Sequence, residues 1–222
     1  MDSLTIVIGI IPPTLRQPML APCRIPHEHE ITSWPMLASE KIDGIRCLVF
    51  PKHGARSRSG CRFRNPHLAR TISEAQAISD RYNLVIEGEL WAPGMGPTEM
   101  QIALREREPI RGLQLMIFDA ISYAEFEGES ATPFERRHSL AMATLDRLSG
   151  CQVLEQQPMD NWRDLCRLYR QVKHDGGEGL MIRKPSGMYH HGRCSIVSAE
   201  IFKVRPIHAN SKQAEIPSGL EV

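Results

Sequence analysis

Short apolar segments recur along this chain of 222 residues, and they constrain the fold more than any other feature of the sequence. Their lengths, their β-branched content and the turn residues that separate them are typical of β-strands. The predicted strands are residues 45–50, 84–91, 113–121, 152–156, 179–182 and 200–204, and the predicted helices are residues 66–80, 98–105, 133–148 and 161–174. Because strands and helices do not alternate regularly, the pattern predicts an α+β fold with antiparallel sheets and flanking helices.

The composition is that of a globular domain with a sizeable core, since 41% of the residues are hydrophobic and 24% are charged. We expect residues 1–17 to form an N-terminal extension, residues 18–206 a single domain, and the polar residues 207–222 a tail. An apolar run at residues 4–11 follows Asp2 and is far shorter than the roughly 20 residues that span a bilayer. We therefore expect no membrane association and a monomer.

The six cysteines contain no CxxC pair, so the sequence predicts neither a zinc site nor a disulfide framework. Reduced thiols favour a cytoplasmic protein. The nine histidines show no metal-ligand spacing either. A net charge of +1 gives no general attraction to nucleic acid, so such binding would need a local cluster of cations. Residues 52–70 form such a cluster, with six Lys and Arg residues and no acidic residue. A run of this kind is either a solvated face or a surface for phosphates.

The stretch ASEKIDGIRCLVF at residues 38–50 places Lys41 between Glu40 and Asp43, directly before a buried strand. A lysine there is either a solvated charge or a nucleophile at the mouth of a pocket. Taken alone, this segment leaves both interpretations open.

Five further segments carry matching chemistry in sequence order: SRSG at 57–60, IEGEL at 86–90, MIFD at 116–119, EGLMIR at 178–183 and FKVR at 202–205. A lysine that attacks an α-phosphate must lose its proton, and the transfer needs cations and a metal to neutralise charge. Carboxylates near strand ends can hold a ribose hydroxyl or a magnesium ion, and Phe118 with Met181 can enclose a base. Singly, each segment is more often a turn, a core residue or a surface pair. Their joint order favours nucleotidyl transfer.

These segments resemble the motifs of the ATP-dependent DNA ligases, a family of covalent nucleotidyltransferases that also includes RNA ligases and mRNA capping enzymes. KIDGIR resembles motif I, SRSG motif Ia, IEGELW motif III, LMIFDAI motif IIIa, EGLMIRKP motif IV and FKVR motif V. The resemblance covers residues from about Pro18 to Pro206. It implies the covalent nucleotidyltransferase, or ATP-grasp-like ligase, fold.

The resemblance also implies a role for each matching residue. Lys41 would form the lysyl-AMP intermediate with ATP. Glu178 and Glu89 would hold Mg²⁺, and nicked double-stranded DNA would be the partner. The nucleotide would contact Ser39, Glu40, Arg46, Arg58, Glu89, Phe118, Met181, Lys203 and Arg205, and DNA would contact Arg58, Arg62 and Arg64.

Three departures from the family pattern stand out. Arg205 replaces the usual lysine of motif V, so a planar guanidinium replaces a point charge. Glu87 replaces the commoner aspartate of motif III. The family carries an OB-fold after motif V, whereas residues 207–222 are too few to form one. We expect self-adenylation to be weakened for that reason, and pre-adenylated nicks to be sealed more readily than ATP-driven ones.

Two other functions remain open at the level of sequence. A capping-type guanylyltransferase uses similar motifs, although the combination of EGLM and DGIR favours a ligase. A non-catalytic module that binds nicks or DNA ends is the other alternative. If the basic run lies along DNA, it contacts phosphates rather than bases, and binding should weaken steeply with salt.

Overall fold

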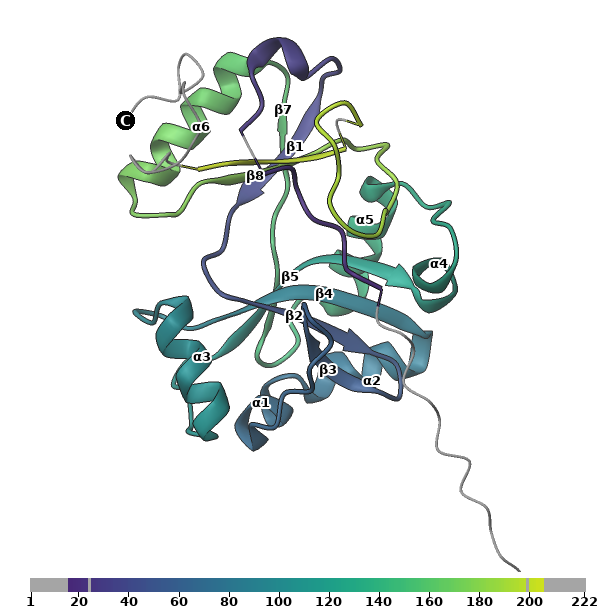
Figure 1. Cartoon of the computed structure of the whole chain (residues 1–222), viewed down its shortest axis with the longest axis vertical. Helices are drawn as coiled ribbons and strands as arrows, with labels where there is room; N and C mark the ends of the chain where they lie inside the picture. The colour runs from purple at the N-terminus through teal and green to yellow at the C-terminus, as the bar shows by residue number, and fades with distance from the viewer. Residues whose placement is uncertain (1–15, 24, 199, 206–222) are drawn as a thin grey trace, which may run out of the picture.

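The computed structural model describes residues 16–23, 25–198 and 200–205. It contains two β-sheets, and Figure 1 shows the smaller sheet in the upper part of the molecule and the larger sheet in the lower part. The smaller sheet has the order β7-β1-β8-β9, with β1 at Met36–Glu40, β7 at Gln157–Met159, β8 at Leu180–Arg183 and β9 at Ile201–Val204. All of its strands are antiparallel.

The larger sheet has the order β3-β2-β4-β5-β6. Its strands are β2 at Ile45–Phe50, β3 at Gly54–Ser57, β4 at Leu84–Trp91, β5 at Gln114–Ser122 and β6 at Cys151–Val153. Only the β5–β6 pair among these is parallel. The prediction of an α+β fold built on antiparallel sheets is therefore confirmed.

Helices cover the outer faces of the sheets. The larger sheet packs against α1 (Pro66–Thr71), α2 (Ser73–Tyr82), α3 (Pro97–Glu106) and α5 (Phe134–Leu145), and their apolar side chains share one buried cluster with β2, β4 and β5. A 3₁₀ turn, η1 (Glu28–Glu30), precedes β1, and α4 (Tyr123–Glu127) follows β5. Figure 1 shows α1, α2 and α3 below the larger sheet.

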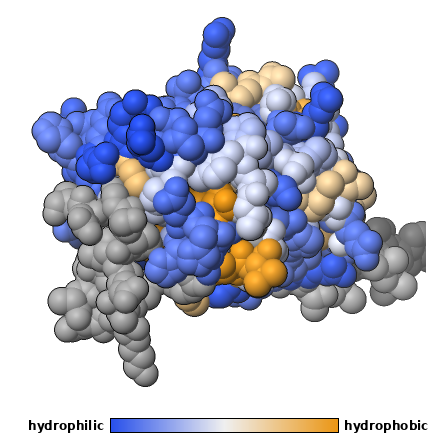
Figure 2. Space-filling model, turned by 90° about the horizontal axis from the view of Figure 1, so that it is seen from above, coloured by the Kyte–Doolittle hydropathy of each residue, from blue (hydrophilic) through white to orange (hydrophobic). Residues whose placement is uncertain are grey.

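The smaller sheet is covered by α6 (Trp162–His174). This helix buries Trp162, Leu165 and Tyr169 against β1 and β8. Its opposite side exposes Arg163 and Arg167. Figure 2, which shows the molecule from above, has mostly hydrophilic residues on this side, with a few hydrophobic ones at the centre. Such a one-sided apolar stripe binds a surface helix to the core beneath it. None of the helices in the described ranges is both long and apolar enough to cross a membrane.

Most predicted elements lie within two residues of their predicted bounds, and β2 and β4 coincide with them. Asn161 caps α6, since its side-chain oxygen accepts a hydrogen bond from the Asp164 amide at 3.0 Å. Pro133, the first residue of the predicted helix 133–148, is the N-cap of α5. Residues 4–11 and 207–222 lie outside the described residues.

Two predicted elements differ in the structure. Only residues 152–153 of the predicted strand 152–156 are in a strand, β6 of the larger sheet, and the chain then crosses to the smaller sheet, where β7 begins at Gln157. The predicted helix 66–80 breaks at Ile72, whose φ of −100° and ψ of 8° leave the helical range. Strands β1, β3 and β7 were not predicted.

Candidate active site

A cavity of about 210 Å³ lies where the two sheets face each other. Its walls come from β1, β8 and β9 of the smaller sheet and from β2, β4 and β5 of the larger one. The predicted site residues among its lining are Ser39, Glu40, Lys41, Arg46, Arg58, Glu89, Phe118, Met181 and Lys203. The fold thus gathers side chains that are up to 164 residues apart in the sequence, from Ser39 to Lys203.

Strand register explains why these side chains share one cavity. In the smaller sheet Ser39 is paired with Met181, and Met181 with Lys203, so the three form one row across β1, β8 and β9. In the larger sheet Arg46 of β2 is paired with Glu89 of β4. Residues paired across strands project from the same face, so each row presents its side chains together.

Lys41 is held in place through both its backbone and its side chain. Its amide donates a 2.8 Å hydrogen bond to the carbonyl oxygen of Gly179, just before β8. Its Nζ atom forms an ion pair with the carboxylate of Glu178, and the two side chains are only 23% and 22% exposed. Lys41 is therefore a partly enclosed amine rather than a solvated surface charge.

Two glycines allow this close approach of backbone segments. A Cβ atom on Gly44 would lie 2.2 Å from the carbonyl oxygen of Leu90. Gly179 has a φ of +154°, and a Cβ atom there would lie 2.0 Å from the carbonyl oxygen of Val204. Only glycine fits such contacts, so both positions fix the path of the chain beside Lys41.

Carboxylates and cations lie close to one another at this cavity. Arg46 donates a hydrogen bond of 2.5 Å from Nη2 to the buried Glu87. Burial opposes the charge on Arg46, but Glu87 and Glu89 outweigh burial and raise the pKa of Arg46. Burial raises the pKa of Glu89 to about 7, although Arg46 and Lys41 act in the opposite direction.

The aromatic ring of Phe118 is in contact with two guanidinium groups. The Cζ atom of Arg46 lies 4.4 Å from the ring centroid, and that of Arg183 lies 5.1 Å from it. The ring is 8% exposed and packs with Met116 and Leu154. Cations over an aromatic face favour a fixed ring orientation, so Phe118 is a rigid part of the cavity wall.

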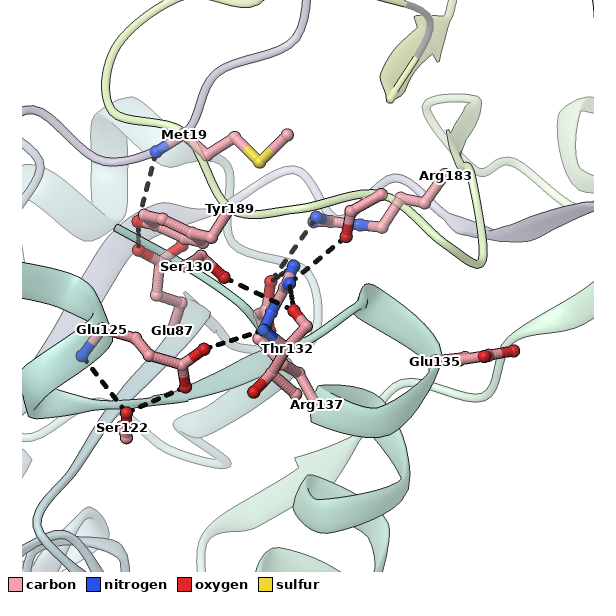
Figure 3. Close-up of polar contacts among 12 residues, drawn as sticks. Met19, Glu87, Ser122, Glu125, Ser130, Thr132, Glu135, Arg137, Arg183 and Tyr189 are labelled. Carbon is pink, nitrogen blue, oxygen red and sulfur yellow. Dashed lines mark hydrogen bonds and ion pairs between the residues drawn. The ribbon is translucent and has the colours of Figure 1, made fainter. Parts of the chain in front are cut away.

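A buried polar network supports this wall from behind. Arg137 binds Asp119 through two hydrogen bonds of 2.8 and 3.0 Å. Glu87 accepts a hydrogen bond from the Tyr189 hydroxyl, which in turn accepts one from the Met19 amide at 3.2 Å. Figure 3 shows Met19, Tyr189 and Glu87 at one side of the network and Arg137 and Arg183 at the other. The Arg137 ion pair lies outside the lining of the cavity and joins α5 to β5.

Four predicted site residues lie outside the lining of this cavity. Glu178 does not line the cavity, but its carboxylate forms an ion pair with Lys41, which does. Arg205 follows β9, and it acts together with burial to lower the pKa of Lys203, with burial the larger cause. Arg62 and Arg64 line a neighbouring cavity that also includes Arg58.

Several cavity residues were missed from the sequence, of which Arg183 is the most informative. Arg183 ends the segment EGLMIR but was assigned no role in the site, and it is only 5% exposed. Burial lowers the pKa of Arg183 to about 10, although Asp119 opposes that shift. The alternation of β8, with Met181 and Arg183 two residues apart, is the signal that points to its position on the same face. The other missed residues are Met19, Leu20, Ala21, Ile42, Leu154, Arg193 and Ile201.

The carboxylates fit a magnesium ion only when phosphates supply further ligands. Among the described residues, no group of three or more His, Cys, Asp and Glu side chains could hold a metal ion. The Oε2 atom of Glu89 is nevertheless buried without a hydrogen-bond partner, and Glu178 lies beside Lys41. Mg²⁺ in proteins is typically held by one or two carboxylates together with substrate phosphates. This donor set fits that pattern.

Solved structures with the same fold include DNA ligases. The chain superposes on Chlorella virus DNA ligase-adenylate with a TM-score of 0.67 and 21% identity, covering 86% of this chain and 67% of that one. For the bacteriophage T7 ATP-dependent DNA ligase in complex with ATP the TM-score is 0.63 and the identity 18%, with 86% and 68% covered. For Pmar-Lig_PreS3 the values are 0.68 and 22%, with 86% and 46% covered, so the chain spans about half of that protein.

The comparison with curated proteins gives no match. The family model described as "ATP dependent DNA ligase domain" matches residues 18–204, a span that includes both sheets, the first five motif segments and all but the last residue of FKVR. The chain therefore belongs to the ATP-dependent DNA ligase domain family.

Proposed function

We propose that this chain is the nucleotidyltransferase part of a DNA ligase and that Lys41 is its nucleophile. In the first step, Nζ of Lys41 attacks the α-phosphorus of ATP, an N–P bond forms, and pyrophosphate leaves. In the second step, a 5′-phosphate oxygen at a nick attacks that phosphorus and releases the lysine. In the third step, the 3′-hydroxyl attacks the activated 5′-phosphate, and AMP leaves.

One observation carries this proposal: Lys41 lies at a cavity whose other walls hold the predicted cations, carboxylates and base-contacting residues. The ion pair with Glu178 keeps the amine directed and gives its proton a neighbouring acceptor. Arg46 and Lys203 supply positive charge where the phosphates must lie.

The remaining residues are assigned to the nucleotide in the same proposal. Phe118 and Met181 would enclose the adenine, Glu89 would accept a hydrogen bond from the ribose, and Ser39 and Glu40 would lie at the adenine edge. Arg58 would pass from the nucleotide to the 5′-phosphate of DNA, and Arg205 would support Lys203 at the α-phosphate. Magnesium, held by Glu89 and Glu178, would neutralise phosphate charge during transfer.

Covalent labelling with α-³²P-ATP tests the core of the proposal. We expect the wild-type chain to retain label after denaturation and Lys41→Ala and Lys41→Arg to lose it. The arginine variant keeps a cation beside Glu178 but removes the amine nucleophile. Lys184→Ala is the matched control, because Lys184 lies outside this cavity, and it should label like the wild type. Label retained by Lys41→Ala would refute the assignment.

The same assay separates the two alternatives. Stronger labelling by α-³²P-GTP than by α-³²P-ATP would favour a capping-type guanylyltransferase. Binding of nicked duplex with no label from either nucleotide would favour a non-catalytic module. We expect ATP labelling to dominate.

A further inference from the structure

A second cavity, of about 830 Å³, adjoins the candidate active site and shares three wall residues with it: Arg46, Arg58 and Glu89. The rest of its lining comes from Gly44 and Ile45 at the start of β2 and from two longer segments that are distant in the sequence. One is the end of β3 with the residues that follow it, up to Arg64, and the other is the C-terminal half of α3 with Arg107. Because the two cavities share these walls, a ligand bound in the first cavity could extend into the second.

The walls of this second cavity are strongly basic. Six arginines line it, against one acidic residue: they are Arg46, Arg58, Arg62, Arg64, Arg105 and Arg107. Arg46 is held by Glu87, but the other five form no ion pair among the described residues and their side chains are exposed. Unpaired cations gathered in a hollow create a local positive potential that attracts polyanions.

The two arginines of α3 could not be recognised as part of a basic surface from the sequence. They lie in the segment Arg105-Glu106-Arg107-Glu108, which has no net charge. The fold separates these charges, because both arginines line the cavity and neither glutamate does. Arg107 achieves this as the C-cap of α3, where its φ of +63° turns the chain out of the helix.

A buried amide holds the two arginine-bearing segments together. Asn65 is 3% exposed and caps α1 directly after Arg64. Its Nδ2 atom donates hydrogen bonds to the carbonyl oxygens of Ala103, at 3.3 Å, and Glu108, at 2.8 Å. These bonds fix the end of α3 beside the segment that carries Arg62 and Arg64. The basic hollow is thus built into the fold rather than formed by loose surface side chains.

We infer that this second cavity binds the phosphodiester backbone of the DNA next to the nick, and that Arg105 and Arg107 are DNA-contacting residues. The inference rests on the proposed function, since it takes the first cavity as the place where AMP meets the 5′-phosphate. Arg58 lines both cavities, so a backbone that presents its 5′-phosphate to the first cavity continues into the second. Contacts of this kind position a duplex and carry no sequence preference.

Salt-dependent binding of a fluorescently labelled nicked duplex tests the inference with the whole chain. Removal of one cation that neutralises a phosphate reduces the slope of log K against log salt by about 0.9. We therefore expect Arg105→Ala/Arg107→Ala to reduce this slope by about 2 and to weaken binding at low salt by about tenfold or more. The control Arg111→Ala/Arg163→Ala removes the same charge from exposed positions outside both cavities and outside residues 52–70, and it should keep the wild-type slope to within about 0.5.

The outcomes separate this inference from the proposed function. A wild-type slope in Arg105→Ala/Arg107→Ala, or an equal loss in the control, would overturn the inference while ATP labelling of Lys41 still supports the function. A larger loss of ATP labelling than of DNA affinity in that variant would also overturn it, because the arginines would then serve the nucleotide. Wild-type protein that neither labels with ATP nor binds the duplex would remove the proposed function itself.

Discussion

At the scale of single residues, Glu89 has the clearest consequence for pH dependence. Its folded-state pKa of about 7 lies above the value of 4.5 expected for an exposed glutamate. The folded chain therefore binds a proton that the unfolded chain has lost between these two values, and folding stability falls as pH rises through that window. Above pH 7 the carboxylate of Glu89 is ionised in the folded chain as well, and the loss of folding stability that its raised pKa causes is then complete.

Substitution of Glu89 by glutamine should remove this dependence. Gln keeps the neutral shape, so we expect Glu89→Gln to match the wild type near pH 5 and to gain stability relative to it by about 2–3 kcal/mol at pH 8. Urea denaturation in buffer containing EDTA and no nucleotide measures the difference. The control Glu106→Gln, on the exposed side of α3, should change stability by no more than about 0.5 kcal/mol at either pH. If the stability difference between Glu89→Gln and the wild type did not change with pH, the raised pKa of Glu89 would be contradicted.

Residue chemistry in the candidate site was predictable where a motif surrounds the residue. The segments around Lys41, Glu89 and Met181 pointed to one cavity, and the structure places all three in its lining. Arg183 was not predicted, because a charged residue at the end of a short strand is usually exposed. Its burial depends on Asp119 and on two aromatic rings from other elements, and no local pattern encodes such partners.

At the scale of elements, the Asp119–Arg137 pair joins α5 to β5 behind the cavity. Both side chains are at most 2% exposed, so either one alone would be a buried, uncompensated charge. Arg183 Nη1 lies 3.9 Å from the same Asp119 carboxylate, and it provides a weaker second partner. The position of α5 therefore depends on a polar contact as well as on its apolar side.

Removal of one partner should be much more damaging than removal of both. We expect Arg137→Met to destabilise the chain by about 3–5 kcal/mol, because Asp119 stays buried without its main partner. In Asp119→Leu/Arg137→Met most of that loss should be recovered, with the remainder due to Arg183, which then lacks its carboxylate. Chemical denaturation followed by circular dichroism gives both values.

The neighbouring residue on α5 supplies the control. Arg136→Met, at an exposed position, should change stability by about 0.5 kcal/mol or less. If Arg137→Met were as mild as Arg136→Met, the ion pair would not hold α5 in place.

Helices and strands were predictable where the pattern of apolar residues marks them clearly. They were missed where pairing with a distant strand determines their structure. Strands β2 and β4 lie inside the larger sheet, and each begins and ends with apolar residues that mark its bounds in the sequence. The segment 151–159 instead contributes β6 to the larger sheet and β7 to the smaller one. The partner of β7 is β1, which lies more than 100 residues away in the sequence. Strand β1, with the sequence MLASE, owes its extended form to its pairing with β7 and β8.

At the scale of the whole molecule, the candidate site exists only because two sheets face each other. Lys41 follows a strand of the smaller sheet, whereas Arg46 and Glu89 belong to the larger one. Local sequence patterns predict the sheets separately, and the crossings of the chain between them bring the rows of side chains together. The basic second cavity arises in the same way, from α3 and the segment after β3.

The order of steps in the proposed reaction makes a final prediction that involves the whole site. Lys41 forms a bond only in the first step and leaves in the second, so a nick that already carries AMP on its 5′-phosphate bypasses it. We expect Lys41→Ala to lower ATP-driven sealing of a plain nick by about 10³-fold or more, as loss of a nucleophile does. Sealing of the pre-adenylated nick should fall by no more than about tenfold, because the cations and carboxylates of the cavity remain.

Gel assays of the two substrates side by side measure the ratio, with Lys184→Ala expected to behave as the wild type on both. An equal loss on both substrates would show that Lys41 acts in the cavity as a structural cation, and the role of nucleophile would then have to be given up.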